Sequence, residues 1–504
     1  MLNWIKSFKK KKSPAPNPTA PGSTNAVSKN PGSRSRNPAR KSSSTNKQTA
    51  SAVAKKAIAA SANRDAIILS RGEHGISRNN IDKHALKVLY RLHNSGFHAC
   101  LVGGAVRDLL LGLKPKDFDV ATDATPEQVS QLFRNCRLIG RRFRLAHVHF
   151  GRLIIEVATY RAAHESSQSG VQDESGRIVR DNVYGELAED VWRRDFTANA
   201  LYYDISDFSV IDFAGGFKDI KKQRLHLIGD AETRYREDPV RMLRAIRFSA
   251  KLGFHIDKAS EVPIHELGHL LQDIPAARLY EEVLKLFHSG HAVRSFELIQ
   301  EFDLLQYLFP EAAISIEENE DVKNMLLIAM QNTDDRIKNE MRVTPAFLFA
   351  ALLWHPVNSK VKEYIDKGMP YSVAIQKTAT KVLSQQSKSV SIPKRFTSTM
   401  RDIWGLQTRF HYRAGKRALS VLQHEKFRAA YDFLCIRAQS NENTGQDDYA
   451  ADLETDCQWW TEIQEQSAEV QKNALFSTGK KSGSSKPRKR RRSSASKAAT
   501  KSQS

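Results

Sequence analysis

The most informative part of this chain is Leu101-Val102-Gly103-Gly104-Ala105-Val106-Arg107-Asp108, which is followed nine residues later by Asp117-Phe118-Asp119-Val120. A glycine pair closes an apolar strand and opens a helix, and two carboxylates then alternate on a second short strand. Side chains at positions i and i+2 of a strand share one face, so Asp117 and Asp119 are predicted to point together over the glycines. Glycines and helix N-terminal amides suit phosphate, and carboxylates bind magnesium. The pattern therefore predicts a divalent metal held beside a triphosphate.

Three further segments follow in a fixed order. They are Ile154-Ile155-Glu156-Val157-Ala158-Thr159-Tyr160-Arg161, then Arg193-Arg194-Asp195-Phe196-Thr197-Ala198-Asn199-Ala200-Leu201, and then Glu237-Asp238-Pro239-Val240-Arg241-Met242-Leu243-Arg244-Ala245-Ile246-Arg247-Phe248. Together with the glycine pair and the Asp-Phe-Asp motif, they resemble the class II nucleotidyltransferases. That group contains the tRNA CCA-adding enzymes and the bacterial poly(A) polymerases. The resemblance covers about residues 70–465.

The charge of the chain is concentrated at its two ends. The 504 residues have a net charge of +22, yet residues 65–470 have a net charge of −3. Residues 1–64 contain 14 lysines and arginines, residues 471–504 contain 11, and neither segment has an acidic residue. Both segments have few large apolar side chains, which predicts disorder. In a protein that acts on RNA we expect such arms to bind phosphates in a salt-dependent way, the alternative being a solubilising tail.

The pattern between the tails is mixed at first and helical afterwards. A helix is predicted over 81–95, and Thr125 followed by Pro126 predicts a capped helix start. Strands are predicted over 99–102, 118–122, 147–150, 154–159 and 201–204. From Pro239 onward the pattern is almost wholly helical, with breaks at 257–258 and 384–391. This predicts an α+β fold.

The expected organisation has an N-terminal nucleotidyltransferase head, a small mixed sheet with helices, followed by an all-α neck and body. The predicted boundaries are a disordered basic tail over 1–64, the head over 65–228, a helical neck for base selection and RNA binding over 229–290, a helical RNA-binding body over 291–465, and a disordered arginine- and lysine-rich tail over 466–504.

Nucleotidyl transfer with two magnesium ions needs two or three convergent carboxylates. Asp117 and Asp119 are the first two, and the resemblance makes Glu156 the third metal ligand. The apolar neighbours of Glu156 predict a buried face, on which a carboxylate needs a partner. The alternative is an exposed residue on an edge strand.

The nucleotide itself is assigned by resemblance. Gly103, Gly104 and Arg107 would cradle the triphosphate, although Arg107 could instead pair with Asp108. Arg194 and Asp195 would address the ribose and phosphates, and Asn199 would help to hold the site. Asp195 is also a candidate catalytic carboxylate, with a helix-capping role left open.

Base selection is expected at the start of one helix. Glu237, Asp238, Arg241 and Arg244 are spaced to lie on neighbouring turns, and a carboxylate with a guanidinium can read the edge of a base without a template. The alternative interpretation is an intrahelical Asp–Arg pair.

The segment Leu138-Ile139-Gly140-Arg141-Arg142-Phe143-Arg144-Leu145-Ala146-His147-Val148 separates the two activities of the group. It resembles a stretch typical of the bacterial poly(A) polymerases. Arg141, Arg142 and Arg144 around an aromatic residue suit contact with an RNA backbone and stacking on bases. A basic structural turn is the alternative.

The expected activity is therefore a template-independent poly(A) polymerase that adds AMP from ATP to RNA 3′ ends with Mg²⁺. The alternatives are a tRNA CCA-adding enzyme and, from another class, a non-catalytic RNA-binding adaptor, which the three carboxylates disfavour. The resemblance implies that the poly(A) tails added to RNA mark it for decay, with the RNA-decay machinery as a partner. A monomer is the default expectation.

Cellular location is inferred from short features. The apolar segment Met1–Phe8 is too short to span a bilayer, so no stable membrane insertion is expected, and a weak contact with the inner membrane face stays open. Cys100, Cys136, Cys435 and Cys457 form no Cys-x-x-Cys motif, which predicts reduced thiols in a cytoplasmic protein. His147-Val148-His149 is assigned to a strand rather than to zinc.

Overall fold

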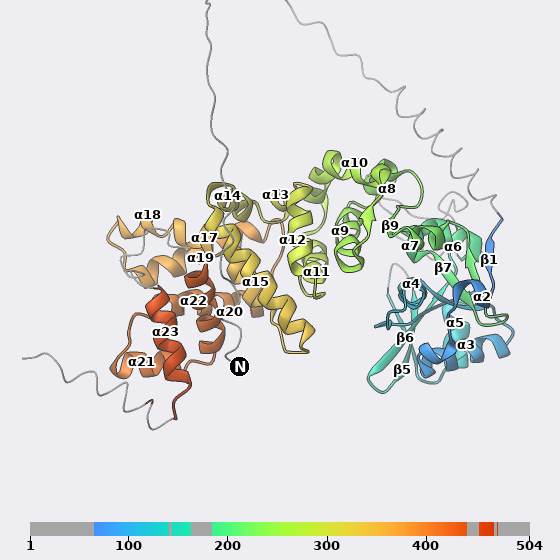
Figure 1. The fold of residues 1–504 in the computed structure, drawn as a ribbon, viewed down its shortest axis with the longest axis horizontal. Coiled ribbons are helices and arrows are strands. Elements are labelled where there is room, and N and C mark those ends of the chain that lie inside the picture. The colour runs from blue at the N-terminus through green and yellow to red at the C-terminus, as the bar shows by residue number, and fades with distance from the viewer. Residues whose placement is uncertain (1–64, 141–143, 163–183, 441–452, 468–470, 472–504) are drawn as a thin grey trace, which may run out of the picture. The chain divides into compact units, whose positions relative to one another are not determined.

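The computed structural model describes residues 65–140, 144–162, 184–440, 453–467 and 471. Its first part is built on one mixed sheet with the strand order β1-β8-β7-β2-β3-β6-β5-β4 (Figure 1). The strands are β1 (Ile67–Leu69), β2 (Ala99–Val102), β3 (Asp119–Thr122), β4 (Cys136–Ile139), β5 (Leu145–Phe150), β6 (Leu153–Thr159), β7 (Leu201–Asp204) and β8 (Val210–Asp212).

The five predicted strands are confirmed with small shifts at their ends. Strands β1, β4 and β8 were not predicted from the sequence. Strand β3 runs antiparallel to β2 and parallel to β6, which makes the sheet mixed. The segments that connect these strands carry α2 (Arg71–His74), η1 (Arg78–Asn80), α3 (Lys83–Asn94), α4 (Gly104–Leu110), α5 (Pro126–Leu132), α6 (Leu187–Arg193) and η2 (Thr197–Asn199), and α7 (Gly216–Lys221) follows β8.

Helix α3 follows the predicted 81–95 closely. The Asp82 side chain accepts hydrogen bonds from the His84 and Ala85 amides and so fixes the first turn. Val88, Leu89 and Leu92 are fully buried in the main core, together with Leu101 and Val120 of the sheet. Helix α5 begins as predicted, since Thr125 caps the Gln128 amide and Pro126 occupies the first turn. Apolar spacing and capping therefore place both helices against the same sheet.

The two faces of the sheet have different surroundings. Leu101 of β2, Val120 of β3 and Val157 of β6 belong to the main core. Their neighbours Cys100 and Val102 point to the opposite face, where they pack in a smaller cluster with Tyr202. Asp119 is the register partner of Val102 and of Glu156, so it lies on that second face. The alternation along the strands thus separates the core from the carboxylates.

The chain from Ala231 onward is almost wholly helical, as predicted. The helices are α8 (Ala231–Glu237), α9 (Val240–Leu252), α10 (Lys258–Leu267), η3 (Gly268–Asp273), α11 (Ala276–Phe287), α12 (Ala292–Glu301), α13 (Leu305–Leu308), α14 (Pro310–Glu318), α15 (Glu320–Lys338), α16 (Pro345–Leu352), α17 (Trp354–Ser359), α18 (Lys362–Ile365), α19 (Tyr371–Gln386), α20 (Lys394–Gln407), α21 (Gly415–Leu422), α22 (Phe427–Gln439) and α23 (Leu453–Gln464). The predicted breaks lie at the start of α10 and between α19 and α20.

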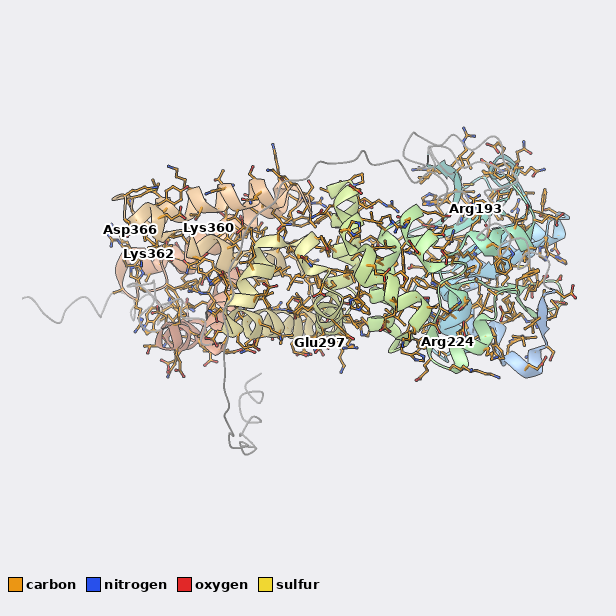
Figure 2. The ribbon with its side chains drawn as sticks, turned by 90° about the horizontal axis from the view of Figure 1, so that it is seen from above. Arg193, Arg224, Glu297, Lys360, Lys362 and Asp366 are labelled. Atoms are coloured by element: carbon orange, nitrogen blue, oxygen red, sulfur yellow. A yellow bond between two sulfur atoms is a disulfide. The ribbon has the colours of Figure 1, made fainter. Side chains whose placement is uncertain are left out.

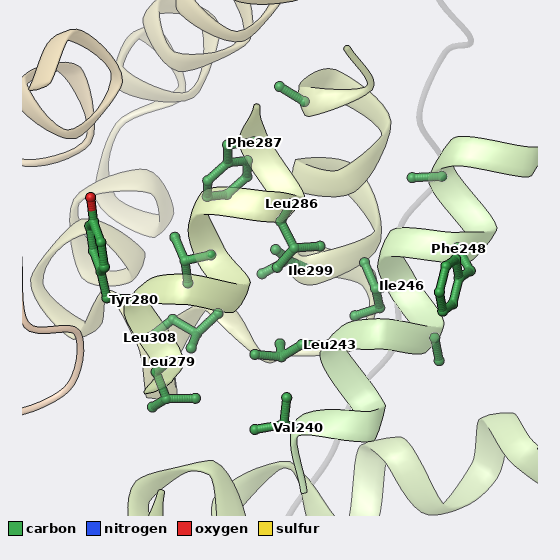
Figure 3. Packing of buried hydrophobic residues seen from close by; sticks show 14 of the residues in the cluster. Val240, Leu243, Ile246, Phe248, Leu279, Tyr280, Leu286, Phe287, Ile299 and Leu308 are labelled. Atoms are coloured by element: carbon green, nitrogen blue, oxygen red, sulfur yellow. The ribbon is translucent and has the colours of Figure 1, made fainter. Parts of the chain in front are cut away.

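Helix α9 is held by its apolar stripe. Leu243 and Ile246 are fully buried and face Leu286 of α11 and Ile299 of α12 (Figure 3). Burying such side chains stabilises by about 1.5–3 kcal/mol each. The opposite side of α9 is left to carry arginines toward the sheet.

A second, two-stranded parallel sheet pairs β9 (Arg224–Leu225) with β10 (His255–Ile256). Arg224, labelled in Figure 2, donates to Asp219 at 2.9 Å and to Asp257 at 3.2 Å. An open cleft beside this pair is lined by Lys222, Arg224, Asp257 and Glu261 among others, and it contains no predicted site residue. Strand β9 thereby ties the segment after the large sheet to α10.

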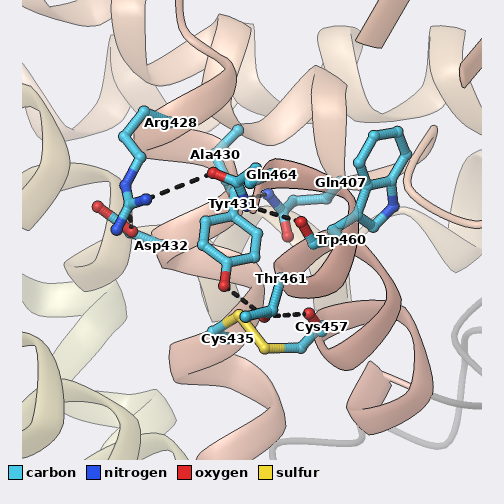
Figure 4. The surroundings of a disulfide bond; sticks show 10 residues. All are labelled: Gln407, Arg428, Ala430, Tyr431, Asp432, Cys435, Cys457, Trp460, Thr461 and Gln464. Carbon is cyan, nitrogen blue, oxygen red and sulfur yellow. Dashed lines mark hydrogen bonds and ion pairs between the residues drawn. A yellow bond between two sulfur atoms is a disulfide. The ribbon is translucent and has the colours of Figure 1, made fainter. Parts of the chain in front are cut away.

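The cysteine prediction is wrong for one pair. Cys435 of α22 and Cys457 of α23 form a disulfide, whereas Cys100 and Cys136 are free thiols (Figure 4). Packing of the two helices around the buried Trp460 brings the cysteine Cα atoms to 5.2 Å. The two cysteines are 22 residues apart, so no local motif announces the pair. Within the described residues, no helix has the length and apolar character needed to cross a membrane.

Candidate active site

Three carboxylates gather on the second face of the sheet. Asp119 begins β3, Glu156 lies opposite it on the parallel neighbour β6, and Asp117 comes two residues earlier. All three side chains are exposed to solvent. Partial loss of hydration among the surrounding protein atoms, and then repulsion from Glu156 and Asp117, raise the pKa of Asp119 to about 6. The three carboxylates therefore form a cluster of like charges that the nearby Arg194 only partly offsets.

The prediction of a buried face for Glu156 is wrong. Glu156 lies in the interior of the sheet, between β3 and β5, yet 49% of its side chain is exposed. The alternative of an edge strand is also wrong. Glu156 is exposed because alternation along β6 turns it away from the core that holds Ile155 and Val157. The oxygens of the three carboxylates do not all lie within 4.8 Å of one another, so a shared cation would have to draw them together.

His147 is a neighbour of this group that the sequence did not assign. It lies on β5, as predicted, and is the register partner of Glu156. Its Nε2 atom is 3.5 Å from Glu156 Oε1. The alternation of His147 and His149 along β5 was the available signal for a side chain on the carboxylate face.

Gly103 and Arg194 lie together beside the carboxylates. Gly103 has φ +73°, which favours glycine, and a Cβ atom there would lie 3.5 Å from Arg194 Nη1. Arg194 is held by Asp190, whose Oδ2 accepts from Nη2 at 2.9 Å, and by the Tyr202 hydroxyl at 2.7 Å from Nε. Its Nη1 atom makes no hydrogen bond within the described part of the chain. One guanidinium nitrogen thus faces the glycine pair.

Asp190 is a second residue that the sequence did not assign. It is buried and accepts hydrogen bonds from Arg194 and from the Tyr202 hydroxyl. Burial acts to raise the pKa of Asp190, but Arg194 and Arg161 outweigh it and hold the pKa below its usual range. An ionised Asp190 therefore keeps Arg194 in place.

A paired network runs from α4 to α9. Arg107 donates from Nε and Nη2 to Asp108 Oδ1, at 2.9 and 2.6 Å, and from Nη1 to Asn199. Asn199 in turn donates to Asp195 at 3.3 Å, and Asp195 accepts two hydrogen bonds from Arg244. The alternative of an Arg107–Asp108 pair is the one observed. Arg107 is 2% exposed, so its guanidinium is committed to the protein.

Asp195 is saturated in this network. Its Oδ1 accepts from the Phe196 amide at 2.9 Å and from Asn199, and its Oδ2 accepts from Arg244. Burial acts to raise the pKa of Asp195, but Arg244 and these hydrogen bonds hold it low. These contacts tie Asp195 to Asn199 and to α9.

Glu237, Asp238, Arg241 and Arg244 do not share one helix. Glu237 ends α8, Asp238 follows it, and only Arg241 and Arg244 lie in α9. The reason is Pro239, which disfavours a helical residue before it. The alternative interpretation, an intrahelical Asp–Arg pair, is also absent among these residues. Arg241 Nη1 instead donates to Glu237 Oε2 at 3.0 Å.

Asp238 is bound from a different helix. Arg278 of α11 donates to Asp238 Oδ2 at 2.7 Å, across 40 residues. Asp238 Oδ1 is buried and accepts no hydrogen bond from the described residues. One carboxylate oxygen at the junction of α8 and α9 is thus fixed, while the other is unsatisfied.

Of the three arginines predicted to bind RNA, only Arg144 is described. It precedes β5, and its Nη1 donates to Glu127 of α5 at 2.5 Å, with both side chains about half exposed. Arg141 and Arg142 lie outside the described residues.

Three family models match the chain. They are the "Poly A polymerase head domain" over residues 99–226, the "Probable RNA and SrmB- binding site of polymerase A" over 253–315, and the "Polymerase A arginine-rich C-terminus" over 367–495.

Curated proteins extend the likeness to most of the chain. Poly(A) polymerase I of Salmonella typhimurium is 50% identical over 415 residues, which is 81% of this chain and 88% of that protein. Poly(A) polymerase I of Haemophilus influenzae is 45% identical over 74% of this chain and 84% of that protein. The CCA-adding enzyme of Bacillus pumilus is 37% identical over 43% of this chain and 52% of that protein.

A solved structure confirms the fold. The apo form II of a CCA-adding enzyme superposes with a TM-score of 0.52 at 19% identity, covering 83% of this chain and 92% of the other. At this identity the likeness speaks for the α+β fold alone.

Proposed function

The chain belongs to the bacterial poly(A) polymerases of the nucleotidyltransferase superfamily, and from that premise we propose which of its residues carry template-independent addition of AMP to RNA 3′ ends. It is a polynucleotide adenylyltransferase, with RNA and ATP as substrates. The observation that supports the assignment of the site is the register of Asp119 against Glu156 on parallel strands, with Asp117 two residues before.

We propose that Asp117, Asp119 and Glu156 hold the divalent cation, and that it is Mg²⁺. The donor set fits, because all the ligands are carboxylate oxygens, which hard cations prefer. The raised pKa of Asp119 supports the proposal. Loss of hydration and then repulsion raise that pKa, and a cation between the carboxylates would remove the part that comes from repulsion by Glu156 and Asp117. When bound, the cation supplies positive charge to the triphosphate and to the attacking 3′-hydroxyl.

We propose that the triphosphate lies along Gly103 and Gly104. Because glycine has no Cβ atom, phosphates can approach the backbone closely there, and Arg194 Nη1 beside it donates no hydrogen bond to any described residue. Arg107 is proposed as a positioning residue, because Asp108 and Asn199 occupy its guanidinium. Asp195 and Asn199 are proposed to join α9 to the sheet rather than to bind metal.

We propose that the base is read at the junction of α8 and α9. Adenine presents an amino group that donates and a ring nitrogen that accepts. Asp238 Oδ1 is an acceptor without a partner among the described residues, and hydrogen bonds of those residues occupy only Nη1 of Arg241. Arg278 orients the Asp238 carboxylate, Glu237 holds Arg241, and Arg244 holds the start of α9 through Asp195.

The finer organisation is proposed on the same basis. We divide the chain into the head over 65–228, the neck over 229–290 and the body over 291–465. Arg141, Arg142 and Arg144 are proposed to contact RNA near the carboxylates. The RNA-decay machinery as a partner, a monomeric state and a cytoplasmic location are proposals that rest on the family.

The test is primer extension on a short unstructured RNA with Mg²⁺ and one nucleoside triphosphate at a time. We expect long ladders with ATP alone. Asp119→Asn should give none, whereas Glu232→Gln, which alters an exposed ion pair of α8, should extend normally. Extension that needs a tRNA-like acceptor and stops after C, C and A would instead indicate a CCA-adding enzyme. Full activity of Asp119→Asn would refute the site.

A further inference from the structure

Three unlike side chains converge at the end of β2 that lies away from the glycine pair. Cys100 of β2 and Asp204 of β7 are register partners on antiparallel strands, and His98 precedes Cys100 by two residues. Their side chains therefore share one face of the sheet. The His98 Nε2 atom is 2.7 Å from Asp204 Oδ2 and 3.8 Å from Cys100 Sγ. All three potential ligand atoms lie within 4.8 Å of one another.

Two of the three side chains, those of His98 and Asp204, are oriented by a second residue. The Tyr160 hydroxyl is 2.9 Å from His98 Nδ1, which leaves Nε2 to face the cluster. The Ser206 amide donates to Asp204 Oδ1 at 2.7 Å, which leaves Oδ2 to face it. The Asp123 carboxylate accepts from the His98 amide at 2.9 Å. Hydrogen bonds of this kind around a histidine and a carboxylate are typical of metal sites.

The surroundings favour a cation. Asp123 and Asp207 add negative charge near His98 beyond that of Asp204. Cys100 is fully buried and Asp204 nearly so, whereas 36% of the His98 side chain is exposed. An ion can therefore approach along His98 and end against a buried sulfur.

The distances suit a small tetrahedral ion. Zinc bonds of about 2.0–2.3 Å imply a separation of about 3.6 Å between a nitrogen and a sulfur ligand and about 3.4 Å between a nitrogen and an oxygen. The observed 3.8 Å between His98 Nε2 and Cys100 Sγ is close to the first value. His98 Nε2 and Asp204 Oδ2 are 2.7 Å apart and share a hydrogen bond. The ion would replace this hydrogen bond, and the two atoms would move slightly apart.

We propose that His98, Cys100 and Asp204 form a Zn²⁺ site, with water in the fourth position. The mixed nitrogen, sulfur and oxygen set suits zinc and differs from the all-carboxylate set of Asp117, Asp119 and Glu156. On binding, the thiol proton of Cys100 and the proton shared by His98 and Asp204 pass to solvent. The ion would tie β2, which leads into Gly103, to β7, which follows Asn199. This inference does not depend on the proposed function.

The test uses the full-length protein, freed of metal with a chelator and titrated with Co²⁺ in excess Mg²⁺. A cobalt–thiolate bond gives a near-ultraviolet charge-transfer band that carboxylate sites cannot give. We expect one equivalent of Co²⁺ to produce the band and Zn²⁺ to abolish it. Cys100→Ser should lose the band, and Cys136→Ser, which changes the other free thiol, should keep it. The Cys435→Ser/Cys457→Ser double variant should also keep it.

A second variant guards against misfolding. Tyr160→Phe removes only the hydroxyl, and it should retain the band with affinity weakened about 10- to 100-fold. Zn²⁺ should also raise the Tm of the wild-type protein and of Cys136→Ser, but not that of Cys100→Ser. A wild-type protein without the band, or a band that survives Cys100→Ser, would mean that His98 and Asp204 form only an ion pair, and would overturn the proposal.

Discussion

Two regions of the molecule are rich in charge. The carboxylates of β3 and β6 place like charges together, whereas the network from Asp108 to Arg244 pairs opposite charges. Loss of hydration, and then repulsion from Glu156 and Asp117, raise the pKa of Asp119 to about 6. Asp195 faces Arg244 and Asn199, so its charge is neutralised by the protein. On this difference rests our proposal that the first region binds a ligand and that the second is structural framework.

The strongest way to break this comparison is to remove a carboxylate of the first region. Asp117→Ala and Asp119→Asn should each lower AMP incorporation by about 100- to 1,000-fold or more, because the cation would lose a ligand. The Tm of the metal-free protein should stay within about 1 °C or rise, since a repulsion is relieved. Primer extension and thermal unfolding measure the two effects. A large fall in Tm would show that this region is framework too.

Substitutions in the network from Asp108 to Arg244 should lower the free energy of unfolding. Arg244→Ala leaves Asp195 partly buried without its cation, and we expect the free energy of unfolding to fall by about 1–3 kcal/mol, less than for a fully buried pair because Arg244 is 31% exposed. Arg236→Ala breaks an exposed pair and should change it little. Denaturant unfolding of both variants is the measurement. Equal stability of the two variants would contradict the role given to Asp195.

Mg²⁺ affinity and the stability of the metal-free protein should both depend on pH through Asp119. Because the pKa of Asp119 is about 6 without metal, its carboxylate is mostly ionised at pH 7 and mostly protonated at pH 5, so Mg²⁺ affinity should fall about tenfold over that range. The folded state also holds more protons than the unfolded state between about pH 4 and 6, so metal-free stability should decrease as the pH rises there. Calorimetric titration with Mg²⁺ tests the first effect. Affinity that does not change between these pH values would show that Asp119 is no ligand.

The smallest expected effect concerns the choice of base. Arg278→Ala frees the Asp238 carboxylate to rotate, and we expect the preference for ATP over CTP in kcat/KM to fall about threefold to tenfold. Total incorporation of AMP should change less. Arg294→Ala, which breaks an exposed pair on α12, is the matched control. An unchanged preference in Arg278→Ala would move base reading away from Asp238.

The sequence alone predicts the order of motifs, the strands that carry Asp119 and Glu156, the turn at Gly103 and the change from a mixed to a helical pattern near Pro239. These features follow from local periodicity and backbone geometry, which depend on near neighbours in the chain. Alternation along a strand would also have predicted that Glu156 is exposed. Its apolar neighbours led instead to the wrong prediction of burial.

Which charged and polar side chains pair with one another depends on tertiary packing. Asp195 and Arg244 are 49 residues apart, Arg107 and Asn199 are 92 apart, and Asp238 and Arg278 are 40 apart. The disulfide between Cys435 and Cys457 and the convergence of His98 with Asp204 are of the same kind. Such pairings depend on which surfaces pack against one another, because a charge is satisfied by whatever lies within a few ångströms of it and the chain can bring that partner from any distance along its length.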